Sequence, residues 1–167
     1  MSDVKERFQQ TTDEFIEILK SFSNNELNTV PFDGSWTAGQ VGDHLYKSYK
    51  SVEILRGTTQ TVNRAKNEKV TMFESTFSDL KIKMESPESI KPTADTIKKS
   101  ELISDLKKRI HEFEDILENE DLSLLCVDFA MPKYGEFTRY EWLAFHTVHT
   151  ERHIQQLKKI RNHLRTE

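Results

Sequence analysis

Three histidines on a helical face that would otherwise be apolar constrain this chain more than any other feature of its sequence. Between Thr138 and about Arg165, residues recur at intervals of three or four in the order Trp142, His146, His149, His153, Leu157, Ile160, Leu164. This spacing predicts one α-helix that turns a single face towards a core. Because an imidazole without a hydrogen-bond partner is costly to bury, we expect other parts of the chain to satisfy these rings.

Two of these histidines have the spacing of metal ligands. His149 and His153 lie one helical turn apart, so their rings can reach the same ion. His44, which lies between Val41 and Leu45 on the inner side of another predicted helix, is the third candidate ligand. Three histidines leave coordination positions open for water or substrate, which is typical of a catalytic metal. The alternative is that the pair is a solvated polar pair without a metal, and the residues alone leave both open.

Helical periodicity extends over most of the remaining chain. Apolar residues follow helical spacing over residues 2–23, from Thr37 to about Leu55, and over residues 100–119. The sequence of residues 57–98 predicts a long crossover with one short helix. The apolar residues 122–131 predict an extended stretch. Together with the last helix, this pattern predicts an all-α fold, a four-helix bundle with a long crossover between its second and third helices.

Helix starts are marked by residues that cap the free backbone N–H groups. Thr37 with Gln40, and Thr138 with Glu141, have the three-residue spacing of a capping box. Ser100 is the expected N-cap of the third helix. These signals place the first turns of three of the four predicted helices.

Composition limits the classes of fold and partner. The 167 residues suit a single domain spanning 1–167, and the count of 5 Gly and 4 Pro is too low for a many-turned β-sandwich. A net charge of −4 and a pI near 5.9 predict no nucleic-acid partner. We expect no membrane partner and a cytoplasmic protein, because no apolar run approaches ~20 residues and the N-terminal residues lack a signal-peptide core. Cys126 is the only cysteine, so no internal disulfide can form, and its apolar neighbours predict an inert packing residue.

Several common enzyme motifs are absent from the sequence. Residues 149–153 read His-Thr-Glu-Arg-His, so Glu151 is one position too late for the zinc-protease pattern. The chain contains no G-x-S-x-G, no phosphate-binding loop and no G-x-G-x-x-G. Ferritin-like di-iron sites use Glu-x-x-His motifs. None of His44, His149 and His153 follows a glutamate at this spacing, so the sequence does not predict a di-iron site.

Two segments carry a resemblance to a known family. Residues 36–45 (Trp-Thr-Ala-Gly-Gln-Val-Gly-Asp-His-Leu) and residues 135–157, with their H-x3-H-x2-Q pattern, resemble DinB-like (YfiT-like) proteins. The resemblance implies a four-helix bundle with one divalent transition metal, nickel or zinc foremost and iron or manganese next, held by His44, His149 and His153. It also implies a homodimer that acts on a small molecule. The activity it implies is thiol-dependent transfer, of bacillithiol or mycothiol type, or a related hydrolysis or isomerisation.

The remaining polar residues of the last helix have weaker assignments. His146, one turn before His149, is the candidate general base. Gln156 either hydrogen-bonds across helices or packs between them. His111 and His163 are expected on the surface. Two other functions stay open besides a metal-dependent enzyme: a metal- or small-ligand-binding bundle without turnover, and a degenerate relative that keeps the histidines but binds no metal.

Overall fold

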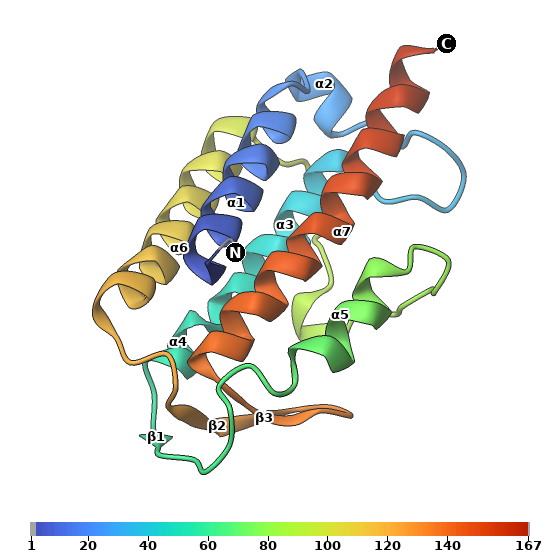
Figure 1. Cartoon of the computed structure of the whole chain (residues 1–167). Helices are drawn as coiled ribbons and strands as arrows, with labels where there is room; N and C mark the ends of the chain where they lie inside the picture. Colours follow the sequence, from blue (N-terminus) through green and yellow to red (C-terminus); the bar gives the residue numbers. More distant parts are fainter. Residues whose placement is uncertain (1–2, 167) are drawn as a thin grey trace.

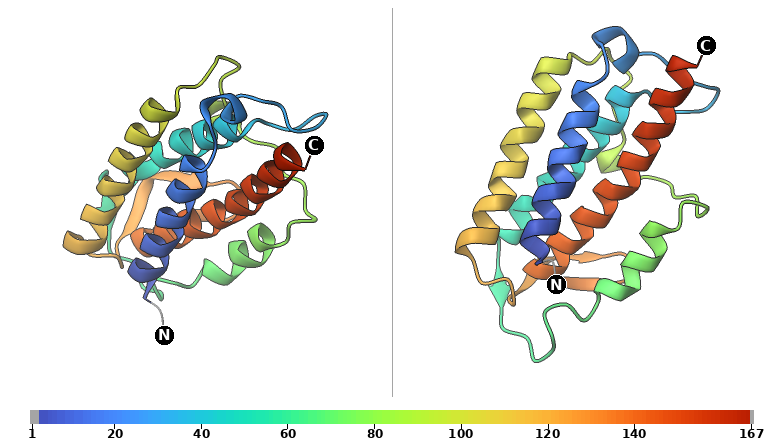
Figure 2. Two further views of the ribbon diagram at one scale, coloured as in Figure 1. Left: turned by 90° about the horizontal axis from the view of Figure 1, so that it is seen from above. Right: turned by 45° about the horizontal axis from the view of Figure 1, so that its top comes forward.

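Long helices lie side by side and form most of the molecule, as the computed structural model shows for residues 3–166 (Figure 1). They are α1 (Val4–Lys20), α3 (Ala38–Ser48), α6 (Lys99–Asn119) and α7 (Arg139–Arg165), and α3 continues through the 3₁₀ turn η1 (Tyr49–Ser51) into α4 (Val52–Leu55). α1 packs against α6 and α7, and α3 packs against the same two helices from the other side (Figure 2). The prediction of a mostly helical chain is confirmed.

The shorter elements connect the ends of these helices. They are α2 (Asn24–Leu27) after α1, then β1 (Thr59–Gln60), α5 (Val70–Ser78) and the 3₁₀ turn η2 (Glu88–Ile90) within the crossover. β2 (Leu125–Met131) and β3 (Gly135–Thr138) join α6 to α7. Among the described residues, no helix has both the length and the apolar character needed to cross a membrane.

The capping predictions hold at two helices and fail at a third. Thr37 and Thr138 each form the expected capping box, with Gln40 and Glu141 respectively. Ser100 is not an N-cap: α6 begins one residue earlier, at Lys99, so Ser100 lies inside its first turn. The expected first helix begins at Val4 in the structure, and Ser2 lies outside the described residues.

The prediction of an all-α fold holds only in the coarser sense of a mostly helical one, because β1, β2 and β3 form a small antiparallel sheet at one end of the helices (Figure 1). Thr59 pairs with Cys126 across β1 and β2, and Leu125 pairs with Thr138 across β2 and β3. The extended stretch at residues 122–131 was visible in the sequence. The pairing of this stretch with β1 was not visible, because the two-residue β1 lies in the crossover, where no alternating pattern marks it.

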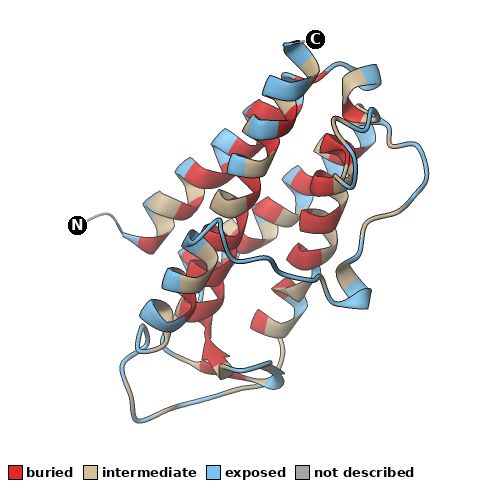
Figure 3. Cartoon of the chain, turned by 90° about the vertical axis from the view of Figure 1, so that its right-hand side faces the viewer, coloured by how far each residue is buried: buried red, intermediate tan, exposed pale blue. Residues whose placement is uncertain are grey.

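The core lies between the long helices, whose buried faces point towards one another (Figure 3). It is rich in fully buried aromatic side chains: Phe8, Phe15, Phe22, Tyr49, Phe73, Phe113, Phe137. Two buried glycines of α3 allow close packing against its neighbours. A Cβ at Gly39 would lie 2.9 Å from the carbonyl oxygen of Leu27, and one at Gly42 would lie 2.7 Å from Cδ2 of Leu102. α3 therefore approaches both α2 and α6 more closely than a larger residue would permit.

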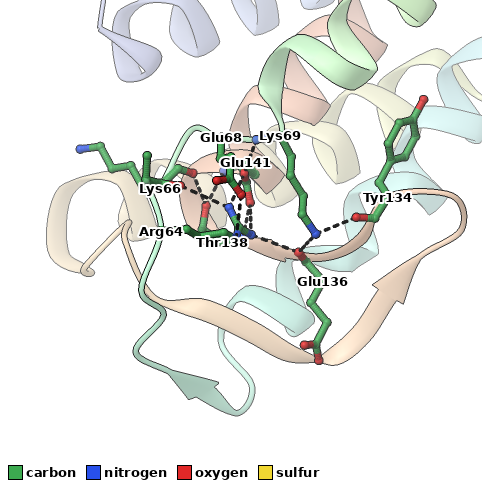
Figure 4. A network of polar contacts seen from close by, with 9 residues as sticks. Arg64, Lys66, Glu68, Lys69, Tyr134, Glu136, Thr138 and Glu141 are labelled. Carbon is green, nitrogen blue, oxygen red and sulfur yellow. Dashed lines mark hydrogen bonds and ion pairs between the residues drawn. The ribbon is translucent and has the colours of Figure 1, made fainter.

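A buried ion pair joins the crossover to the start of α7 (Figure 4). The two terminal guanidinium nitrogens of Arg64 each donate to the carboxylate of Glu141 at 2.8 Å. The backbone N–H of Lys69 donates to the same carboxylate at 2.7 Å. The side chain of Lys69 donates to the carbonyls of Tyr134 and Glu136 in the β2–β3 hairpin. Burial alone would raise the pKa of the fully buried Glu141, but these bonds hold it below its ordinary value.

We expect Glu141→Gln to lower the free energy of unfolding by about 3 kcal/mol, because it leaves the Arg64 guanidinium without a buried counter-charge. Urea unfolding monitored by circular dichroism measures this effect. Glu136→Gln is the matched control, since its carboxylate points away from the network (Figure 4). The control should change the unfolding free energy by less than about 0.5 kcal/mol. Equal effects of the two substitutions would contradict this account of Glu141.

Candidate metal centre

The structure brings His44, His149 and His153 together between α3 and α7. The Nε2 atom of His149 lies 3.3 Å from Nε2 of His44 and 3.2 Å from Nε2 of His153. One ligand atom from each residue lies within 4.8 Å of the other two, and all three side chains are buried. These are the three residues that the sequence predicts as metal ligands, and the group they form could hold a metal ion.

The other ring nitrogens of His44 and His153 have hydrogen-bond acceptors. Nδ1 of His44 lies 2.8 Å from the carbonyl oxygen of Ile90. Because a carbonyl can only accept, this nitrogen carries the proton and Nε2 presents a lone pair. Nδ1 of His153 lies 2.7 Å from Oε1 of Gln156, which selects the same tautomer. Carbonyl groups behind ligating imidazoles typically fix the orientation of the rings.

The facing lone pairs favour a cation between the rings. Two of the three Nε2 atoms are acceptors, so a proton on His149 could satisfy only part of the cluster. A metal with ligands at about 2.0–2.1 Å in tetrahedral directions would separate their nitrogens by roughly 3.3–3.4 Å. The observed separations of 3.2 and 3.3 Å are close to that value. The donor set and its spacing therefore fit a divalent ion.

Aromatic rings enclose the three histidines. The Trp36 ring lies 5.1 Å from that of His44 and stacks on that of His153 at 6.5 Å. The rings of Phe77 and Phe145 lie 5.7 and 5.5 Å from that of His149. The histidines are only 2–9% exposed as a result. An apolar enclosure of this kind strengthens electrostatic interactions at the site.

Burial also keeps the imidazoles neutral. It lowers the pKa of His44, lowers that of His149 well below the ordinary value, and lowers that of His153 to about 3. For His149 and His153, repulsion between neighbouring rings acts in the same direction. Neutral imidazole is the form that binds a metal, so the cluster is ready to do so at neutral pH.

His146 is not part of this cluster. Its Nε2 lies 2.5 Å from Oγ of Ser51, and its ring packs against Tyr49, Phe113 and Trp142. Its Nδ1 is buried without a hydrogen-bond partner among the described residues, and burial lowers its pKa to about 3. The role of His146 as general base stays a prediction, and its surroundings are those of a core residue.

The structure also locates residues that the sequence left without a clear role. Gln156 contacts His153 on its own helix instead of reaching across helices. Cys126 is buried, and burial raises the pKa of its thiol to about 11, in keeping with a packing residue. Sequence reasoning missed Ile90, whose carbonyl orients His44, and Ser48, whose hydroxyl lies 3.5 Å from Nδ1 of His149. A backbone carbonyl in an irregular segment leaves no signal in a sequence.

Comparisons with known proteins bear on the family and the fold of the chain. The sequence model of the DinB superfamily matches residues 7–157. The chain is 26% identical over 151 residues to the uncharacterized protein YuaE of Bacillus subtilis (strain 168), covering 86% of this chain and 88% of that protein. A crystal structure described as that of a candidate DinB family member from Exiguobacterium sibiricum 255-15 superposes with a TM-score of 0.53. It is 15% identical and covers 98% of this chain and 93% of its own, so it supports the fold alone.

We expect acidification to destabilise the metal-free protein. Burial lowers the folded-state pKa of His146 and His153 to about 3, whereas both titrate near 6.5 when unfolded. Above pH 6.5 both states are neutral and no penalty arises. As the pH falls from 6.5 towards 3, only the unfolded chain takes up protons, so the free energy of unfolding drops by up to about 1.4 kcal/mol per pH unit for each residue.

Urea unfolding at pH 7.5, 6.5 and 5.5 measures this loss. His146→Leu should make the pH dependence shallower, and replacement of the exposed His111 by Gln should leave it unchanged. An unfolding free energy that stays constant between pH 6.5 and 5.5 would contradict the assignment of buried neutral imidazoles.

Proposed function

Because this chain belongs to the DinB superfamily, we propose that it is a metal-dependent enzyme whose centre is the cluster of His44, His149 and His153. The observation that carries the proposal is the convergence of three buried Nε2 atoms, at least two of them unprotonated, at spacings that suit one divalent ion. Nickel and zinc are the foremost candidates, since imidazole ligands suit both, followed by iron and manganese.

A divalent ion bound there would lower the pKa of a water or thiol at an open coordination position and hold the anion as a nucleophile. The chain itself supplies the orientation of the ligands. The Ile90 carbonyl and the Gln156 amide keep the protons of His44 and His153 on Nδ1. Trp36 and Phe77 exclude bulk water from the rings that they cover.

We further propose that the reaction is thiol-dependent transfer to a small electrophilic substrate, or a related hydrolysis or isomerisation. Support comes from the resemblance of residues 36–45 and 135–157 to DinB-like proteins and from the three-histidine donor set. The same resemblance supports a four-helix-bundle description of the helical packing, with residues 57–98 as its crossover, and a homodimer.

A second candidate is a protein that holds a metal or a small ligand without turnover. The burial of all three histidines favours it, because an enzyme must also let a substrate reach the centre. Reaction of a metal-bound thiol distinguishes the two. A charge-transfer absorption band on adding thiol to the nickel- or cobalt-loaded protein, followed by consumption of an added electrophile, supports the enzyme, and a band without consumption, or no band at saturating thiol, supports the second candidate.

The metal content of the purified protein tests the centre directly. We expect close to one equivalent of a divalent transition metal by elemental analysis, after purification without an affinity metal column. His149→Ala should reduce it to background, because it removes the nitrogen that faces both other ligands. His111→Ala, on the exposed side of α6, should retain the full equivalent. No metal in the parent protein, even after reconstitution at neutral pH, would exclude the proposed centre.

His146→Gln separates catalysis from packing at the candidate general base. A base that touches the substrate should, when replaced, lower the rate of thiol transfer by about 10²-fold or more and leave the metal content unchanged. A packing residue should, when replaced, lower the free energy of unfolding and leave the rate per folded, metal-loaded molecule within a factor of about two. Measuring rate, metal content and stability on the same preparation decides between the two roles.

A further inference from the structure

The proposed centre is nearly closed to solvent. Its three histidines are 2–9% exposed. A thiol or an electrophile larger than water therefore needs part of the chain to move before it can reach the metal position.

One segment joins elements that pack on the two helices carrying the histidines. Residues 79–91, here called the strap, leave the end of α5, which packs on α7, and reach η2, which packs on α3 (Figure 1). The strap thus spans the gap between the two helices that carry the three ligands. The carbonyl of Ile90, near its far end, is the group that orients His44.

Arg152 holds the near end of the strap. It lies on α7 between His149 and His153, and its guanidinium donates to the carbonyls of Phe77 at 3.2 Å and Asp79 at 2.9 Å, and to that of Ile82. At the far end, the side chain of Lys47 on α3 donates to the carbonyl of Lys91 at 2.9 Å. Each helix that supplies ligands therefore also supplies a cation that binds the backbone of the strap.

Little else fixes the strap. Its apolar side chains point largely into solvent, with Leu80 57%, Ile82 40% and Met84 39% exposed. Residues 79–85 are all exposed, in contrast to the buried faces of α3 and α7. A segment held by a few surface hydrogen bonds and by little apolar burial opens at a much lower free energy than the helices beneath it.

We propose that the strap is a gate over the three-histidine centre, and that Arg152 is the latch that keeps it closed. Opening breaks the bonds from Arg152 to the strap and to the carbonyl of Phe77, whose ring lies on His149, so that both the strap and this ring can move away from the ligand nitrogens while the long helices stay in place. The gate rests on the proposed function, because it supplies the access that a catalytic centre needs. It also accounts for how a site this buried could exchange its ligands.

Chemical modification of the metal-free protein tests the gate without requiring activity. Diethyl pyrocarbonate acylates neutral imidazole nitrogens, and peptide mass spectrometry gives the rate at each histidine. In the wild type we expect slow modification of His44, His149 and His153, and fast modification of the exposed His111. In Arg152→Gln the three cluster histidines should react at least about tenfold faster, the factor that the loss of even one of its three hydrogen bonds from a charged donor would give.

Three comparisons control this experiment. His146, buried on the same helix, should keep its wild-type rate, because the gate does not cover it. Arg161→Gln removes the same charge from α7 at a residue that bonds Ser21 on the far side from the strap, and should leave all rates unchanged. Lys47→Gln releases the other end of the strap and should also accelerate modification of the cluster, which keeps the test open if Arg152→Gln does not fold.

The outcomes separate the gate from the proposed metal centre. Wild-type rates at the three histidines in both Arg152→Gln and Lys47→Gln, or rates in the wild type as fast as at His111, would overturn the gate. Equal acceleration of modification at His146 would indicate a general loss of packing in the helices, and would overturn the gate too. Addition of Zn²⁺ or Ni²⁺ to the wild type should protect the three cluster histidines, and lack of protection would count against the metal centre while leaving the gate result intact.

Discussion

The facing lone pairs of three buried imidazoles are the constraint on which the rest of the structure depends. His44 and His153 each direct an unprotonated Nε2 towards Nε2 of His149, inside a shell of aromatic rings. Such an arrangement is unfavourable unless a cation satisfies it or the surrounding packing enforces it. The long helices α3 and α7 provide that packing, because the buried side chains of both helices hold the rings in place from both sides.

The crossover contributes to the centre as much as the helices do. Its first part is fixed by the ion pair of Arg64 with Glu141, at the position where α7 begins. Its last part delivers the Ile90 carbonyl to His44 and the strap to Arg152. The crossover therefore contacts the start of the helix that carries two ligands and orients the third ligand.

Part of this site could be predicted from local pattern. The shared helical face of His149 and His153, which are four residues apart, and the capping boxes at Thr37 and Thr138 follow from helix geometry alone. The small sheet could not be predicted, because β1 is two residues long and pairs with residues more than sixty positions away. Assigning Ser100 as the N-cap of α6 failed for a related reason: propensity alone cannot separate a cap from a residue in the first turn.

By itself the sequence determined which residues would be helical and which side chains would share a face, because both depend on neighbours within one or two turns. It also determined the chemical identity of the candidate ligands. Only the tertiary structure decided that Nε2 rather than Nδ1 points inward, since this depends on the Ile90 carbonyl, which comes from a segment without periodicity. Tertiary structure also decided that His146 lies apart from the cluster: it is one helical turn from His149, as His153 is, but its ring meets Ser51 and Phe113 instead of the ligand nitrogens.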